Sequence, residues 1–191
     1  MKHIKDTISF IQDSFKSTEF IPLHAPNFGG NEKNYLIETI DSTFVSSVGA
    51  YVDQFESMMT AVTNTKKSVA VVNGTAGIQV ALRLVGVSAG DEVITQALTF
   101  VATANAIAYN GASPIFLDVD IDTMGLSPKA VFQFLEEFGE LREECCFNKK
   151  TGKRISACLP MHTFGFPVHL DELKAVCDAW NIPIVEDAAE S

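Results

Sequence analysis

The sequence has no excess of basic residues, no long uninterrupted hydrophobic run and no secretion signal. Its 14 Lys and Arg residues stand against 24 Asp and Glu residues, which gives a formal net charge of -10 at pH 7. Polyanions would be repelled, so the charge argues against a general binder of nucleic acids or anionic membranes. No segment reaches the ~20 apolar residues of a membrane span, and the first residues lack the apolar core of a signal peptide. We therefore expect a cytoplasmic protein without nucleic-acid or membrane partners.

The cysteines also lack the spacing of a functional cluster. They stand at positions 145, 146, 158 and 177, which fits neither a zinc knuckle nor a CxxC redox pair. We expect reduced thiols and no metal site. Cys158 and Cys177 lie in apolar stretches and are expected in the core, because a free cysteine behaves as a small hydrophobe.

Repeats, low-complexity tracts and linkers are absent, and 47% of the residues are hydrophobic. This composition predicts an N-terminal arm over residues 1–30, followed by one structural unit over residues 31–191. Strand-like and helix-like segments alternate in that unit. Expected strands are 68–72, 92–95, 114–117, 155–161 and 182–186, and expected helices are 31–44, 50–62, 78–87, 101–110, 129–138 and 171–180. The alternation predicts an α/β fold with a mainly parallel sheet and helices on both faces.

The first candidate for chemistry is the turn Asn73-Gly74-Thr75-Ala76-Gly77, which follows the first expected strand and opens a helix. N–H groups at a helix N-terminus lack helical partners, and the helix dipole favours negative charge there, so a phosphate could bind. A capped turn that binds nothing remains an equally open interpretation. The turn matches neither the dinucleotide pattern GxGxxG nor the P-loop.

Two further candidates follow expected strands. Phe100 lies just past a strand end, where an aromatic ring can stack on a flat ligand or can belong to the core. The segment Ile184-Val185-Glu186-Asp187 ends in two carboxylates. An acid at the carboxyl end of a strand can hold a protonated pyridine nitrogen, although Asp187 could equally be a helix N-cap.

The order and combination of these features resembles the fold-type I pyridoxal-phosphate (PLP) enzymes, in particular the sugar aminotransferases named after DegT, DnrJ, EryC and StrS. The resemblance runs from about Pro22 to Ser191. Its segments are Val45–Gly49 with Phe55-Glu56, Asn73–Ala76, Leu98–Thr103, Gly111–Pro114 with Asp118–Asp120, and Val185–Ala189. Phe28–Glu32 and Met161–Gly165 are similar to the branch that aminates UDP-4-keto-6-deoxy-amino-sugars on the way to legionaminic-acid-type sugars.

This resemblance implies PLP as the cofactor and gives each candidate a role. Gly74, Thr75 and Ala76 would hold the cofactor phosphate. Phe100 would stack on the pyridine face, and Asp187 would pair with the pyridine nitrogen.

Two other positions receive less definite roles. Glu190 stands where the family usually has Gln or His, near the ring hydroxyl. His162 could lie near the cofactor edge, or it could be satisfied by backbone groups at a strand end. The Schiff-base lysine of the family lies a few dozen residues beyond the strand-terminal Asp. We therefore expect no catalytic residue before Ser191, an incomplete PLP-binding large domain over residues 31–191, and a chain that is inactive alone.

The parent enzyme, by the same resemblance, would move an amino group from an amino-acid donor, expected to be glutamate, to a nucleotide-linked keto-sugar. A homodimer is expected, because family sites are built between two subunits. Two alternatives remain open, a PLP-dependent sugar dehydratase of the same fold and a non-catalytic binding module. A dinucleotide-binding Rossmann domain is disfavoured, because GxGxxG is absent after the first expected strand.

Overall fold

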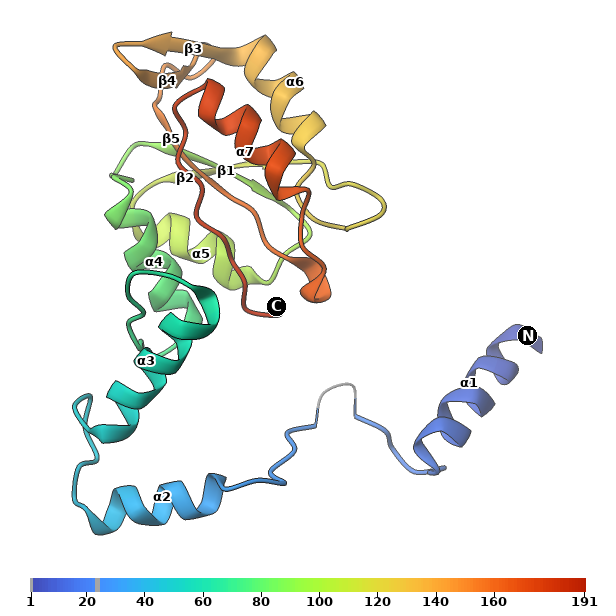
Figure 1. The fold of residues 1–191 in the computed structure, drawn as a ribbon. Helices are drawn as coiled ribbons and strands as arrows, with labels where there is room; N and C mark the ends of the chain where they lie inside the picture. The colour runs from blue at the N-terminus through green and yellow to red at the C-terminus, as the bar shows by residue number, and fades with distance from the viewer. Residues whose placement is uncertain (1, 23–24) are drawn as a thin grey trace. The chain divides into compact units, whose positions relative to one another are not determined.

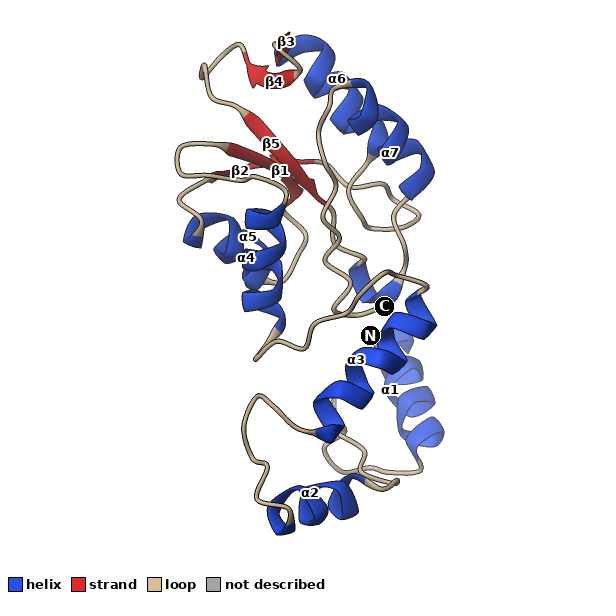
Figure 2. Ribbon diagram, turned by 60° about the vertical axis from the view of Figure 1, so that its left-hand side comes forward, coloured by secondary structure: helices blue, strands red, loops and turns tan. Residues whose placement is uncertain are grey.

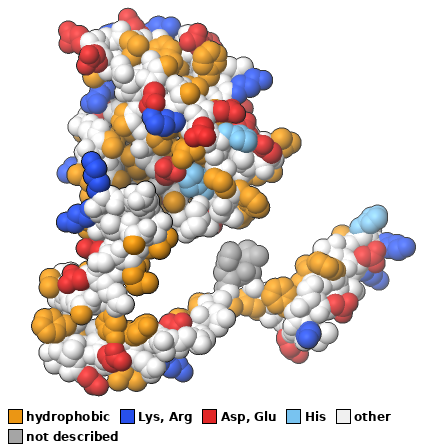
Figure 3. Space-filling model, in the orientation of Figure 1, with side chains coloured by type: hydrophobic (Ala, Val, Ile, Leu, Met, Phe, Trp, Pro, Cys, Tyr) orange, Lys and Arg blue, Asp and Glu red, His pale blue; other side chains and the backbone are white. Residues whose placement is uncertain are grey.

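The computed structural model describes residues 2–22 and 25–191, and the chain divides into two compact units at Ser68. The N-terminal unit contains α1 (Lys2–Phe15), α2 (Glu32–Asp41) and α3 (Ala50–Thr63) (Figure 1). No residue of these helices is buried, and hydrophobic side chains lie at their surfaces (Figure 3). The domain boundary expected after residue 30 stays a prediction.

The C-terminal unit is an α/β layer structure. Its parallel sheet has the strand order β2-β1-β5, with β1 (Glu92–Gln96), β2 (Ser113–Leu117) and β5 (Ile155–Leu159). Four helices flank the sheet, namely α4 (Gly74–Leu84), α5 (Val101–Tyr109), α6 (Pro128–Phe138) and α7 (Leu170–Ala179). Helices α4 and α5 cover one face, and α6 and α7 cover the other (Figures 1 and 2). This arrangement confirms the predicted fold class.

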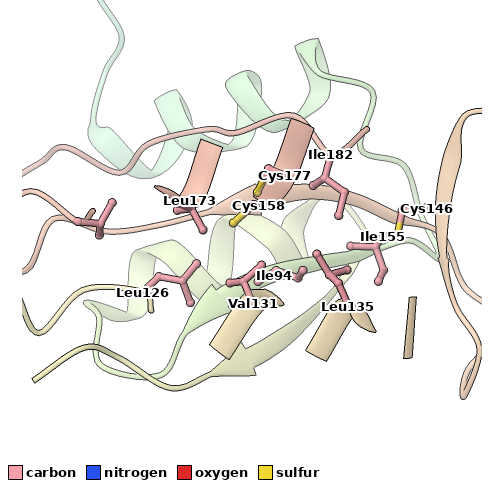
Figure 4. Packing of buried hydrophobic residues seen from close by; sticks show 11 residues of the cluster. Ile94, Leu126, Val131, Leu135, Cys146, Ile155, Cys158, Leu173, Cys177 and Ile182 are labelled. Atoms are coloured by element: carbon pink, nitrogen blue, oxygen red, sulfur yellow. The ribbon is translucent and has the colours of Figure 1, made fainter. Parts of the chain in front are cut away.

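Alternation along β1 explains why both faces are covered. Successive side chains of a strand point to opposite faces. Val93 packs with residues of α4 and α5, whereas Ile94 packs with residues of α6 and α7. Figure 4 shows Ile94 beside Val131 and Leu135 of α6. Each face of the sheet therefore has its own hydrophobic core.

A fourth extended segment lies beside β5. Parallel bridges join Cys158 to Ile184 and Met161 to Asp187, although no continuous strand forms over 182–186. The N–H of Asp187 donates to the carbonyl of Pro160 at 2.9 Å, and its own carbonyl accepts from the N–H of His162 at 3.1 Å. These bonds place Asp187 at the carboxyl end of the sheet.

One expected strand is absent, and one hairpin forms that was not expected. Residues 68–72 form no strand, and Val72 is 88% exposed. A β-strand is stabilised by backbone hydrogen bonds to a neighbouring strand, and neither sheet of the described residues includes residues 68–72. Conversely, the segment near Cys145 forms an antiparallel hairpin of β3 (Gly139–Arg142) and β4 (Cys145–Asn148). Its turn residues, Glu143 and Glu144, have positive φ angles of 47° and 67°. Gly or Asn usually occupies such positions, and because neither is present here the sequence contains no signal for this turn.

A short 3-10 turn, η1 (Thr163–Gly165), follows β5. None of the helices formed by the described residues is long and apolar enough to cross a membrane.

Candidate functional site

A hollow of about 300 Å³ lies in the C-terminal unit, where the chain leaves β1, β5 and the bridged segment that ends at Asp187. Its walls come from the first turns of α4, from the start of α5 and from the residues that follow the other two segments. The lining residues are Gly74, Thr75, Ile78, Phe100, Ala102, Met161, Asp187, Ala189 and Glu190. This is the edge at which parallel sheets bind ligands.

The N-terminus of α4 forms one wall. Asn73 is the N-cap, and its side-chain Oδ1 accepts a hydrogen bond from the N–H of Ala76 at 2.9 Å. Gly74 and Thr75 line the hollow, whereas Ala76 does not. A Cβ added at Gly74 would meet no atom within 4 Å, so the space beside this backbone is open. The first turn can therefore receive an anion at Gly74 and Thr75.

Asp187 also lines the hollow and is only 5% exposed. Its Oδ2 accepts a hydrogen bond from the hydroxyl of Thr103 at 2.6 Å. A buried carboxylate is costly unless it is hydrogen-bonded or paired. Together with the backbone bonds on either side of it, this contact fixes where the acid points.

Phe100 lies at the mouth of the hollow, at the N-cap position of α5, and is 72% exposed. It is therefore not a core residue. An exposed ring beside a hollow offers a flat apolar face on which a planar ligand can stack.

Glu190 also lines the hollow, and its carboxylate is already engaged. Glu190 Oε2 accepts from the backbone N–H of Phe164 at 2.6 Å. Phe164 has a φ of 54°, in the left-handed region, and the bond to Glu190 helps to hold this turn. Glu190, Phe100 and Met161 border a second hollow of about 230 Å³ as well.

His162 is not among the residues that line the hollow. Its Nδ1 accepts from the N–H of Val168 at 3.2 Å, so the ring proton lies on Nε2. Nε2 then donates to Glu186 at 2.9 Å. The ring is satisfied within the protein, and its contact with a cofactor edge stays a prediction.

Two polar residues near the hollow were not singled out by the sequence. Thr103 is fully buried and holds Asp187. Gln96 is fully buried as well; its Oε1 accepts from the N–H groups of Leu126 and Met161, and its Nε2 donates to the carbonyl of Met161. Gln96 thereby fixes one wall of the hollow. The available signal was a polar side chain inside an apolar strand or helix, a position that requires a partner.

The arrangement suits one kind of ligand. A helix N-terminus can bind an anionic group, a buried carboxylate can hold a protonated nitrogen, and an aromatic face can cover a planar ring. Of the described residues that line the hollow, none is a lysine.

Comparison with known proteins agrees with this chemistry. EpsN of Bacillus subtilis (strain 168), whose name assigns it to the pyridoxal phosphate-dependent aminotransferases, is 38% identical over 171 residues, covering 90% of this chain and 42% of EpsN. GDP-perosamine synthase of Escherichia coli O157:H7 is 33% identical over 173 residues, which cover 91% of this chain and 43% of the synthase. The structure of an aminotransferase from Psychrobacter cryohalolentis has a TM-score of 0.75 at 27% sequence identity. The match covers 91% of this chain and 40% of that aminotransferase.

The chain thus spans less than half the length of the relatives it matches. The profile of the DegT/DnrJ/EryC1/StrS aminotransferase family matches residues 26–191. The chain belongs to the DegT/DnrJ/EryC1/StrS aminotransferase family.

Proposed function

We propose that the hollow binds PLP and that the whole protein is a PLP-dependent aminotransferase acting on a nucleotide-linked keto-sugar. One observation carries the proposal. A buried carboxylate, Asp187, faces the same hollow as the N-terminus of α4 and the exposed ring of Phe100. These are the acceptor, the anion site and the aromatic face that a phosphorylated pyridine requires.

The residues present fit that group. The N–H groups of Gly74 and Thr75 would bind the phosphate, as would the Thr75 hydroxyl. Phe100 would cover one face of the ring and exclude water from it. Asp187 would keep a proton on the ring nitrogen, because an ionised carboxylate stabilises the cation beside it. When bound, PLP supplies an electron sink for the carbanion chemistry of amino-group transfer.

The substrate assignment rests on similarity. One relative is named as a synthase of a GDP-linked sugar, which supports a nucleotide-sugar substrate. We propose a UDP-4-keto-6-deoxy-amino-sugar as the acceptor and glutamate as the amino donor. We also propose a homodimer in which residues 31–191 form part of the PLP-binding large domain.

The catalytic lysine is proposed to lie outside residues 1–191, since none of the described lining residues is a lysine. Binding of PLP to this chain is then non-covalent. The same observation suits a binding module, and it leaves open a dehydratase in which another residue replaces the lysine.

Binding is tested by titrating PLP into the folded chain and measuring the dissociation constant by calorimetry. We expect saturable binding that dialysis reverses, and weaker binding of pyridoxal, which lacks the phosphate. Asp187→Asn preserves the side-chain shape and should weaken PLP binding about tenfold, because a hydrogen bond to a charged group is lost. Absence of saturable binding in a folded sample would contradict the proposal.

Catalysis is tested separately. Glutamate added to the PLP-loaded chain should yield pyridoxamine phosphate no faster than free PLP does. The whole protein, given glutamate and the UDP-linked keto-sugar, should yield an amino-sugar detected by mass spectrometry. Turnover by residues 1–191 alone would overturn the placement of the lysine, and lack of turnover by the whole protein would overturn the substrate assignment.

A further inference from the structure

We infer that Thr103 is a positioning residue for Asp187 and that Thr99 orients the hydroxyl of Thr103. This inference rests on the proposed binding of PLP at the hollow. Neither threonine lines the hollow of about 300 Å³ in which the phosphate and the ring would lie, and Thr99 borders the second hollow. Their effect on a ligand would be exerted through the carboxylate of Asp187.

Two consecutive hydrogen bonds link Thr99, Thr103 and Asp187. The hydroxyl of Thr103 lies 2.6 Å from Asp187 Oδ2 and 2.6 Å from the hydroxyl of Thr99. An ionised carboxylate can only accept, so Thr103 donates its single proton to Asp187. The Thr103 oxygen must then accept, so the hydroxyl of Thr99 donates to it. The direction of both bonds follows from the charge on Asp187.

Burial makes the hydrogen bond from Thr103 to Asp187 difficult for water to replace. Thr103 is fully buried, and Asp187 is 5% exposed. Water therefore has little access to replace the hydroxyl if it is removed, and an acceptor left without its donor in such a place is destabilised. Loss of the Thr103 hydroxyl should leave Asp187 Oδ2 without its side-chain donor, so the carboxylate would no longer be held in one orientation.

The geometry also assigns separate tasks to the two carboxylate oxygens. Oδ2 is held by Thr103 at 2.6 Å, whereas the contact of Oδ1 with the N–H of Ala189 is long, at 3.4 Å. Oδ1 is therefore the less engaged oxygen, and we assign it to the protonated ring nitrogen. The bond to Oδ2 restricts rotation of the carboxylate and would thereby hold Oδ1 in one position.

The test compares PLP with 1-deaza-PLP, in which a C–H group replaces the ring nitrogen. The measured quantity is the ratio of the two dissociation constants, determined by calorimetry with the chain at neutral pH. In the unaltered chain the ratio should favour PLP. Thr103→Val keeps the side-chain volume and removes the donor, so the ratio should fall about tenfold. Thr103→Ser should restore most of it, and Thr99→Val should lower it by a smaller factor.

Thr95→Val is the matched control. Thr95 is also a fully buried threonine at the sheet, but its hydroxyl donates to the carbonyl of Leu159 instead of Asp187. This variant should leave the ratio unchanged even if it lowers the melting temperature. If Thr103→Val is poorly folded, Thr99→Val and Thr103→Ser still report on the same chain of bonds.

The outcomes separate the two proposals. If the unaltered chain does not bind PLP or does not discriminate it from the deaza analogue, the proposed role of Asp187 in PLP binding fails. If discrimination is present but Thr103→Val retains it, the inference about Thr103 is wrong. Equal weakening of both ligands by Thr103→Val would also overturn the inference, because it indicates a structural role alone.

Discussion

Asn73 engages two of the backbone N–H groups in the first turn of α4. Its side chain takes the N–H of Ala76, and its carbonyl accepts from the N–H of Gly77 at 3.1 Å. The N–H groups of Gly74 and Thr75 lie before these in the helix. The phosphate role that the resemblance implies for Ala76 stays a prediction, and the cap gives Gly74 and Thr75 the stronger geometric case.

Substitutions of Asn73 should distinguish its effect on the stability of the fold from its effect on PLP binding. Asn73→Ala should lower the free energy of unfolding by about 1 kcal/mol, because an N-cap side chain is lost. Asn73→Asp keeps an acceptor for Ala76 and should retain stability, but its negative charge should weaken PLP binding through repulsion of the phosphate. Urea denaturation and PLP titration measure the two effects. An Asn73→Ala midpoint equal to that of the unaltered chain would contradict the role of the cap.

An ion pair away from the hollow gives a pH-dependent contribution to stability. His169 Nε2 and Asp122 Oδ2 lie 3.0 Å apart, and the hydrogen bond raises the pKa of His169 and lowers the pKa of Asp122. The His169 contribution is fully present below its unfolded pKa of about 6.5 and is lost as the pH rises through the raised folded pKa. The Asp122 contribution is present above about pH 3.9 and is lost as the pH falls through the lowered folded pKa. The pair thus stabilises the fold most at mildly acidic pH.

Asp122→Asn should return the pKa of His169 toward its ordinary value, because the principal cause of the upward shift is removed. An NMR titration of the His169 ring measures this change directly. Asp178→Asn alters a carboxylate of α7, the helix that begins after His169, and serves as the control, since Asp178 does not contribute to the shift. A His169 pKa that is the same in Asp122→Asn and the unaltered chain would refute the assignment.

At the scale of elements, the junction between α6 and β3 depends on the absence of a side chain at Gly139. A Cβ there would lie 2.5 Å from the carbonyl oxygen of Leu135 and 2.7 Å from the Trp180 ring. The helix end and the ring of Trp180 therefore approach each other too closely for any other residue.

Gly139→Ala should destabilise the protein by about 1–3 kcal/mol, because the backbone carbonyl and the ring must both shift. Thermal and urea unfolding measure the effect. Gly74→Ala is a control for the loss of glycine itself, since an added Cβ meets no atom within 4 Å and should be tolerated. Equal stability of Gly139→Ala and the unaltered chain would show that the junction can relax.

At the scale of the whole molecule, the two units differ in how they are stabilised. The C-terminal unit buries side chains on both faces of its sheet. Helices α1, α2 and α3 have 14, 10 and 14 residues and bury none of them. Isolated helices shorter than about 12–15 residues are marginal in water. The exposed apolar surface of these helices is the kind that an interface covers.

Hydrogen exchange followed by mass spectrometry should therefore divide the chain near Ser68. In dilute solution the amides of β1 and β5 should exchange slowly, and those of α1 to α3 should exchange rapidly. Protection of α1 to α3 that increases with protein concentration is the result expected for the proposed homodimer. Strong protection of these helices that is independent of concentration would contradict both expectations.

The sequence alone predicted the α/β class and the parallel sheet, because hydrophobic periodicity is a local property that each segment carries by itself. It also gave Gly74, Thr75, Phe100, Asp187 and Glu190 as candidate site residues, and the fold brings these five to one hollow. It did not predict the bond from Thr103 to Asp187, because these residues are 84 positions apart and only packing of α5 against the sheet joins them. For the same reason it could not decide that His162 is satisfied by Glu186 and Val168 or that residues 68–72 form no strand. Those outcomes depend on which neighbours supply hydrogen-bond partners, and only the tertiary structure determines that.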